Sequence, residues 1–252
     1  MRLRTEGILL NSSPVGESDL LLIFFTDRLG KVQVIAKGAL RSHKRFMGIL
    51  LSLNHLELEL IPTRVRETGY FLNLASLKKS RFSISQNPER LGAGYALAEL
   101  IEKSLPELSP EPILYELLES GLDRIQSARN FREELFYYLL RFLEQMGYLP
   151  SLDFCSVCGA KLKFEDAHYY FSVRKGGYVC GNCQRKPDKS LREISAGFAK
   201  TLKALRRLAP SKPAQIRLLE KDYRFGLELF NDFIAWQIGA SLKSLVFLKQ
   251  FE

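Results

Sequence analysis

Apolar residues in the first eighty positions recur at the short, alternating spacing of β-strands. Residues 56–60 alternate strictly between leucine and glutamate, and turn residues such as Asn11 to Pro14 separate the apolar runs. Alternation of period two is typical of strands with one buried face. The pattern predicts five short strands, at residues 5–10, 19–26, 31–36, 50–61 and 71–77. Five strands without a helical period favour a small barrel of the OB-fold type, although an SH3-like barrel or a meander fits the same pattern.

From Pro88 onward apolar positions recur every three or four residues, which predicts helices. The pattern predicts five of them, at about residues 88–105, 112–125, 135–146 and 195–209, with the last from 214 or 216 to 236. Ser195 is a plausible N-cap for the fourth helix. The apolar stripe of the fifth helix includes Trp236 and is predicted to be mostly buried. The apolar tail from Ser244 to Phe251 is expected to dock on the body of the protein or to contact a partner.

The four cysteines of the chain form two Cys-x-x-Cys pairs, Cys155 with Cys158 and Cys180 with Cys183. Twenty-one residues separate Cys158 from Cys180, and within them the residues around a Gly-Gly turn predict a strand, a turn and a second strand. Each pair can present two thiolates to one tetrahedral ion. The spacing therefore predicts one zinc ion on a β-hairpin.

Disulfide or redox chemistry is the alternative for these cysteines. Disulfides require an oxidising compartment, and the first residues contain no secretory apolar segment. A thioredoxin-like redox site has one Cys-x-x-Cys pair. Four thiolates also complete the coordination shell and leave no position for a reactive water, so we expect a structural zinc.

The period change and the cysteines together predict an α+β protein of two domains. We expect an OB-fold domain at residues 1–81 and a mainly helical domain at residues 82–252, with the zinc module at residues 155–183. No apolar run reaches the length of a membrane span, and the chain is expected to be cytoplasmic.

The net charge of +9 is distributed unevenly along the chain. It is +6 over residues 1–81, −4 over 82–184, +8 over 185–217 and −1 over 218–252. Two basic blocks around an acidic middle are typical of a polyanion-binding protein, and nucleic acid is the expected ligand. The acidic helical part is expected to dock proteins.

A basic loop between the third and fourth predicted strands is the first candidate for binding DNA. It contains four cations and an aromatic residue, namely Lys37, Arg41, Lys44, Arg45 and Phe46. Cations can follow the phosphates of a single strand while an aromatic ring stacks on a base. The alternative is a solvated flexible loop.

A second basic block lies on one face of the helix predicted after Ser195. Its members are Lys200, Lys203, Arg206 and Arg207. They can continue the DNA track, or they can balance the negative charge of the zinc thiolates.

The motifs of common enzymes are absent. The sequence contains no Walker A lysine motif, no G-x-S-x-G and no Gly-rich turn between a strand and a helix. We therefore expect a binding protein. A zinc-ribbon scaffold that binds structured RNA in transcription or translation is the alternative to a DNA-binding role.

Short motifs along the whole chain resemble the bacterial RecO family of recombination mediators. They are Gly7-Ile-Leu-Leu, Gly16-Glu-Ser-Asp19, Phe25-Thr-Asp-Arg-Leu-Gly-Lys31, Ala36-Lys-Gly-Ala39 and the two cysteine pairs. The resemblance implies an OB-fold followed by a helical domain with a zinc site, and no enzymatic activity.

The resemblance also implies partners and a place of action. It implies binding of single- and double-stranded DNA and annealing of complementary strands. With RecR, such a protein helps to load RecA onto strands coated by single-stranded-DNA-binding protein. The expected location is the cytoplasm, in association with the nucleoid.

Overall fold

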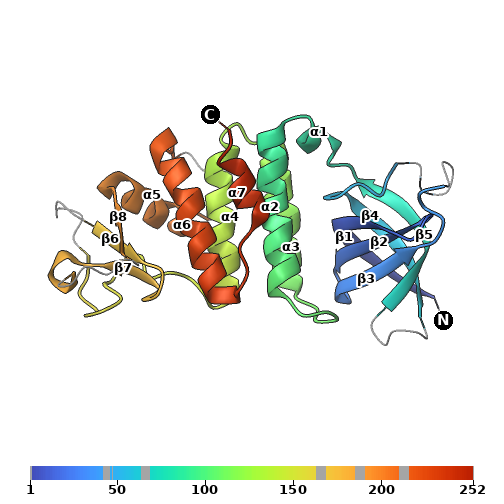
Figure 1. Ribbon diagram of the computed structural model, residues 1–252, viewed down its shortest axis with the longest axis horizontal. Helices are drawn as coiled ribbons and strands as arrows, with labels where there is room; N and C mark the ends of the chain where they lie inside the picture. The colour runs from blue at the N-terminus through green and yellow to red at the C-terminus, as the bar shows by residue number, and fades with distance from the viewer. Residues whose placement is uncertain are drawn as a thin grey trace. The chain divides into compact units, whose positions relative to one another are not determined.

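The computed structural model describes residues 2–41, 46, 48–63, 69–162, 169–184, 191–209 and 216–251. The chain forms two compact units, residues 1–126 and residues 127–252. Figure 1 labels the helices and strands of both. The first unit holds the barrel and the helices that follow it, and the domain boundary expected at residue 81 stays a prediction. No helix in the described part of the chain is long and apolar enough to span a membrane.

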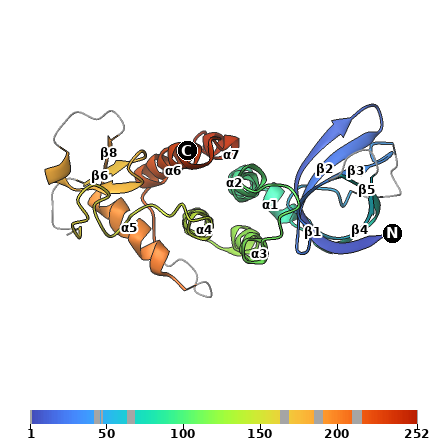
Figure 2. The same ribbon diagram turned by 90° about the horizontal axis from the view of Figure 1, so that it is seen from below.

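Five strands form a closed barrel in the order β1-β2-β3-β5-β4 (Figure 2). Their bounds are β1 Leu3–Val15, β2 Asp19–Thr26, β3 Gly30–Ala36, β4 His55–Pro62 and β5 Gly69–Lys79. All neighbours pair antiparallel except β3 and β5, which run parallel from Gln33↔Gly69 to Ile35↔Phe71. This closed order confirms the predicted OB-like barrel and excludes an open meander.

Alternation of apolar and polar residues decides which side chains point into the barrel. In β3 every second residue is buried, and the interior collects leucines, valines and Phe24 from all five strands. The prediction of a turn at Asn11–Pro14 was wrong. These residues extend β1 beyond an irregularity between Leu9 and Asn11 and pair with the first half of β2.

Three helices complete the first unit: α1 Phe82–Ser85, α2 Pro88–Ser104 and α3 Pro112–Ser127. The Asn87 side chain accepts a hydrogen bond of 2.9 Å from the Arg90 N–H and so caps α2, with Pro88 in the first turn where its missing N–H is harmless. The sequence predicted α2 and α3 but not the single turn of α1.

Polar contacts from the side chains of His55 and Arg81 attach α3 to the barrel. His55 of β4 is buried and contacts the Glu119 carboxylate through Nδ1 at 3.0 Å and the Tyr115 hydroxyl through Nε2 at 3.1 Å. Burial raises the pKa of Tyr115, so its hydroxyl stays protonated and can donate to the imidazole. The Arg81 guanidinium, which is fully buried, binds the Asp123 carboxylate and the Glu119 carbonyl.

The second unit contains a small sheet and four α-helices in its described part. The helices are α4 Phe131–Gln145, α5 Ala196–Arg207, α6 Glu220–Ile238 and α7 Lys243–Leu248. The sheet has the order β7-β6-β8, with β6 at Tyr169–Ser172, β7 at Gly177–Val179 and β8 at Leu191–Ile194. The hairpin of β6 and β7 was predicted, whereas β8 was not. Ser195 caps α5 as predicted, because its hydroxyl accepts the Phe198 N–H at 2.9 Å.

Aromatic rings form the centre of the second unit. Phe136 of α4 stacks on Phe230 of α6 with ring centroids 5.2 Å apart, and it contacts Phe198 of α5 edge-on at 6.4 Å. Leu245 and Leu248 of α7 are buried, so the apolar tail docks on the protein body. The prediction that Trp236 is mostly buried was wrong, because this side chain is 56% exposed.

We expect Gly226→Ala to destabilise the second unit by about 1 to 3 kcal/mol. A methyl group on Gly226 would lie 2.6 Å from Cζ of Phe136 and 3.0 Å from Cζ of Phe198, and these packed rings cannot move aside freely. The matched control is Gly197→Ala, where the added carbon meets nothing closer than 3.8 Å. Thermal and denaturant unfolding of both variants test this, and equal stabilities would contradict the packing described here.

We expect Asp123→Ala to lower the free energy of unfolding of the first unit by about 2 kcal/mol or more, because it leaves the buried Arg81 cation without a carboxylate. Burial alone would raise the pKa of Asp123, but Lys79 and Arg81 outweigh it and lower the pKa. A lowered pKa stabilises the fold above the unfolded-state value near 4, and this stability is lost as the pH falls further.

Unfolding measured from pH 6 to pH 2.5 therefore checks the role of Asp123. The wild-type chain should lose stability below about pH 4, and Asp123→Asn should lose less over the same range. Lys79→Ala is the control, since it removes the half-exposed partner of the same carboxylate and should have the smaller effect. An identical acid profile for Asp123→Asn would contradict the assignment.

Candidate metal centre and nucleic-acid interface

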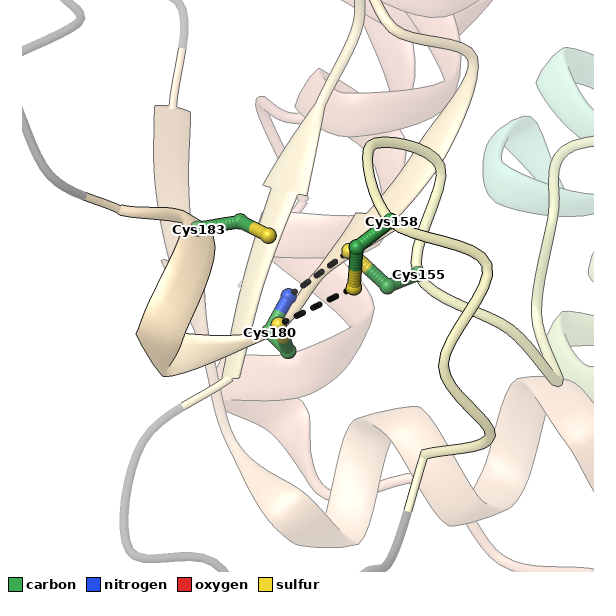
Figure 3. Close-up of side chains that lie close together, drawn as sticks. All are labelled: Cys155, Cys158, Cys180 and Cys183. Carbon is green, nitrogen blue, oxygen red and sulfur yellow. Dashed lines mark hydrogen bonds between the residues drawn. The ribbon is translucent and has the colours of Figure 1, made fainter.

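Two chain reversals bring the four cysteines together (Figure 3). Cys155 and Cys158 lie on the segment after α4, where the Gly159 N–H donates to the Cys155 carbonyl at 2.9 Å. Gly159 has φ +70°, a left-handed conformation that glycine adopts without strain. Cys180 and Cys183 follow β7, on a short 3-10 turn at Gly181–Cys183. The hairpin thus supplies the second pair, as the sequence predicted.

Backbone amides surround the sulfur of Cys155. The N–H groups of Val157 and Cys180 each point to this sulfur at 3.4 Å. Burial raises the pKa of Cys155, but backbone donors from Cys180, Cys158 and Val157 outweigh it and hold the pKa at about 6. The site therefore favours the thiolate form at this position, which is the form that binds metals.

The geometry of the four sulfur atoms fits one tetrahedral ion. All four lie within 4.8 Å of one another, and Cys158 Sγ is 3.8 Å from Cys180 Sγ. Zinc–sulfur bonds of about 2.3 Å at tetrahedral angles place the sulfurs about 3.8 Å apart. The cysteine cluster is thus compatible with a zinc site.

The second basic block surrounds an acidic residue next to the cysteine cluster. Lys203 Nζ is 2.5 Å from Asp153, Arg206 Nη1 is 3.0 Å away and Arg207 Nη2 is 3.2 Å away. Burial would raise the pKa of Asp153, but these cations outweigh it and lower the pKa. Asp153 precedes Cys155 by two residues. Its ion pairs with Lys203, Arg206 and Arg207 therefore hold the segment of the first cysteine pair against α5.

The sequence predicts two roles for this block, binding to DNA and charge balance at the zinc thiolates, and the contact with Asp153 is a third. The carboxylate that the three cations contact was not among the site residues predicted from the sequence. No spacing rule connects Asp153 with a helix fifty residues later, so only the fold brings them together. Arg207 keeps most of its surface exposed, and Lys200 is exposed on the same helix.

The basic loop begins where β3 ends, and its base is held against the start of β2. The Gly38 N–H donates to the Asp19 carboxylate at 2.8 Å, and the Leu40 N–H donates to the Ser18 carbonyl at 2.9 Å. These contacts place Arg41, which forms an exposed ion pair with Glu17 at 2.9 Å. Lys44 and Arg45 lie outside the described residues.

Phe46 occupies a different place from the one that its proposed stacking role requires. Its side chain is 4% exposed and packs in the barrel core with Phe24, so its ring is not available to a base in this structure. A different aromatic ring, that of Phe71 of β5, lies beside the described base of the loop. The Lys37 ammonium lies 4.3 Å from the centre of this ring, a cation–π contact. The contact between Lys37 and Phe71 was not predicted from the sequence, because it depends on the parallel pairing of β5 with β3.

Two family models match almost the whole chain. "Recombination protein O N terminal" matches residues 1–81, which hold the barrel, and "Recombination protein O C terminal" matches residues 85–246, which hold the helices and the cysteine cluster.

Relatives from several bacteria match over nearly their full length. The chain is 32% identical to the DNA repair protein RecO of Geobacter metallireducens, covering 99% of this chain and 98% of the relative. It is 31% identical to the protein of that name from Syntrophobacter fumaroxidans, at 98% and 97% coverage. The Bacillus pumilus relative is 26% identical, at 100% and 95% coverage. With both halves matched and the coverage nearly complete, the chain belongs to the RecO family of DNA repair and recombination proteins.

Proposed function

We propose that this chain is a non-enzymatic recombination mediator that binds single-stranded DNA and anneals complementary strands. The observation that carries the proposal is the Lys37–Phe71 pair, which sets a cation and an aromatic ring side by side on the outside of an OB-like barrel. A cation for phosphate and a ring for a base are the two elements of sequence-independent binding to single strands. Double-stranded DNA offers the phosphates alone.

The basic loop is the proposed main contact with phosphate. Lys37 and Arg41 stand at its base, and Lys44 and Arg45 belong to the same loop. The exposed Arg41–Glu17 pair contributes little to stability, so Arg41 can exchange this partner for a phosphate.

The helix α5 supplies a second, weaker contact. Lys200 and Arg207 are exposed and can meet phosphate directly. Lys203 and Arg206 are largely occupied by Asp153, so their proposed contribution to binding is smaller.

The proposed partners follow from the family. With RecR, the protein would help to load RecA onto DNA coated by single-stranded-DNA-binding protein, and it would act in the cytoplasm at the nucleoid. The four cysteines would hold one structural Zn²⁺, which stabilises the second unit and takes no part in chemistry. The OB-fold domain would span residues 1–81 and the helical domain residues 82–252.

We expect the double variant Lys37→Ala, Arg41→Ala to weaken binding to oligonucleotides of any sequence. Each phosphate contact on a single strand contributes about 0.7 to the slope of log affinity against log salt, so the slope should fall by at most about 1.4. Adding Lys44→Ala and Arg45→Ala should bring the fall to about 3. Salt titration of binding by fluorescence anisotropy measures both, and annealing should slow in parallel.

A charge-matched control removes two cations of α6, Lys221 and Arg224. It carries the same change in net charge and should leave the salt slope close to that of the wild-type chain. If the loop variants kept an unchanged slope with an intact fold, the loop would be merely solvated.

We expect loss of the metal to unfold the cysteine hairpin and loosen the second unit. Binding energy at such a site is folding energy, so Cys155→Ser should lower the free energy of unfolding by more than about 3 kcal/mol. Elemental analysis and thermal unfolding, before and after chelation, provide the measurement, and added Zn²⁺ should restore the unfolding midpoint.

Ser156→Ala is the matched control within the same knuckle. The Ser156 hydroxyl oxygen is buried and has no hydrogen-bond partner among the residues that the structure describes, so its removal should preserve both metal and stability. A well-folded wild-type protein that contains no metal would refute the structural role of zinc.

A further inference from the structure

The single tryptophan of the chain lies exposed on α6. Trp236 is 56% exposed, whereas Phe233 and Leu229, one and two turns earlier on the helix, are buried. The Trp236 ring therefore contributes little to the core, in which Phe233 and Leu229 are packed. Exposed tryptophan is uncommon away from binding surfaces, where it supplies a large, rigid contact area.

A cation from another element lies beside this ring. Arg174 belongs to the turn between β6 and β7, and its guanidinium carbon is 5.6 Å from the centre of the Trp236 ring, within cation–π range. The hairpin is fixed on α6 because the rings of Phe171 and Phe233 meet edge-on at 5.8 Å, and Figure 2 shows the two elements side by side. The Lys175 N–H, which donates to the Ser172 hydroxyl at 3.2 Å, further holds the turn.

Two carboxylates that lie on the same side of α6 as Trp236 already form ion pairs with cations. Glu228 and Asp232 precede Trp236 by eight and four residues, so they lie on the same side of α6. Arg192 of β8 binds Asp232 and lies 3.8 Å from Glu228, and Lys249 is 2.7 Å from Glu228. The exposed Arg174 and Lys175 add two further positive charges. Among these described side chains, four cations thus outnumber two carboxylates, which suits an anionic ligand.

We propose that Trp236 stacks on a base of single-stranded DNA while Arg174 contacts an adjacent phosphate. This inference rests on the proposed binding of single strands, and it adds a base-contacting site on the second unit. Stacking on an aromatic ring requires the open face of a base, which a single strand offers and a duplex hides. A positive surface with one rigid ring has both elements that such a strand requires.

Tryptophan fluorescence tests the inference directly, because Trp236 is the only tryptophan. Addition of a single-stranded oligonucleotide to the full-length protein should quench the emission, with the same midpoint as binding followed by anisotropy. Trp236→Ala should weaken binding about 5-fold or more, the effect of losing one stacked base, while Trp236→Phe should retain most of the affinity. Arg174→Ala should lower the salt slope by about 0.7.

Phe82→Ala is the control, since it removes an exposed aromatic ring from the first unit, which contributes no residue to this surface, and it should leave binding unchanged. Oligonucleotide binding without quenching, together with full affinity of Trp236→Ala, would overturn the inference and leave the proposed function intact. Equal quenching by duplex DNA would also overturn it. If anisotropy detected no binding at all, the proposed function and this inference would fail together.

Discussion

A buried arginine holds the first unit together. The Arg81 side chain follows β5, has no exposed surface and directs its guanidinium to the Asp123 carboxylate and the Glu119 carbonyl. The backbone N–H of Arg81 donates to the Asn54 side-chain oxygen at 2.8 Å. Burying a guanidinium is costly unless hydrogen-bonding and anionic partners replace the water that it loses. Separation of the end of β5 from α3 would therefore leave the Arg81 cation without its carboxylate. This constraint explains why the first compact unit continues past the barrel into the helices.

The polar contacts of His55 and Arg81 with α3 come from the first residue of β4 and from the region just after β5, which lie side by side. His55 opens β4, and Arg81 follows β5, which is the antiparallel neighbour of β4. Both side chains reach residues 115–123 of α3. The helix is thereby fixed at the edge where β4 begins and β5 ends, while the basic loop extends from the end of β3. The proposed DNA contacts and the helical attachment thus use different parts of the same barrel.

Local pattern and spacing carried the sequence-based predictions, and long-range contacts limited them. Leucine–glutamate alternation was enough to predict β4, and two Cys-x-x-Cys pairs were enough to predict that the four cysteines meet, because each rule operates within a few residues. Phe46 was predicted to be a loop residue because His43, Lys44 and Arg45 precede it, yet its side chain packs in the barrel interior. Trp236 fitted the helical period of a buried stripe, but the stripe continues beyond the part of α6 that the unit covers. The Asp153 cluster and the Lys37–Phe71 pair depend on tertiary contacts that no local rule encodes.

The parallel pairing of β3 with β5 has a consequence for synthesis of the chain. A ribosome releases β1, β2 and β3 first, and these three can pair as a meander whose apolar face has nothing to cover it. The ring closes only when β5 emerges, after both β4 and the segment before it. At about 5–20 residues per second, the interval between the release of Ala36 and Lys79 lasts about 2 to 9 s. During that time the nascent chain exposes an unpaired sheet edge and the apolar interior of the barrel. Both promote aggregation, so the nascent chain depends most on chaperones during this interval.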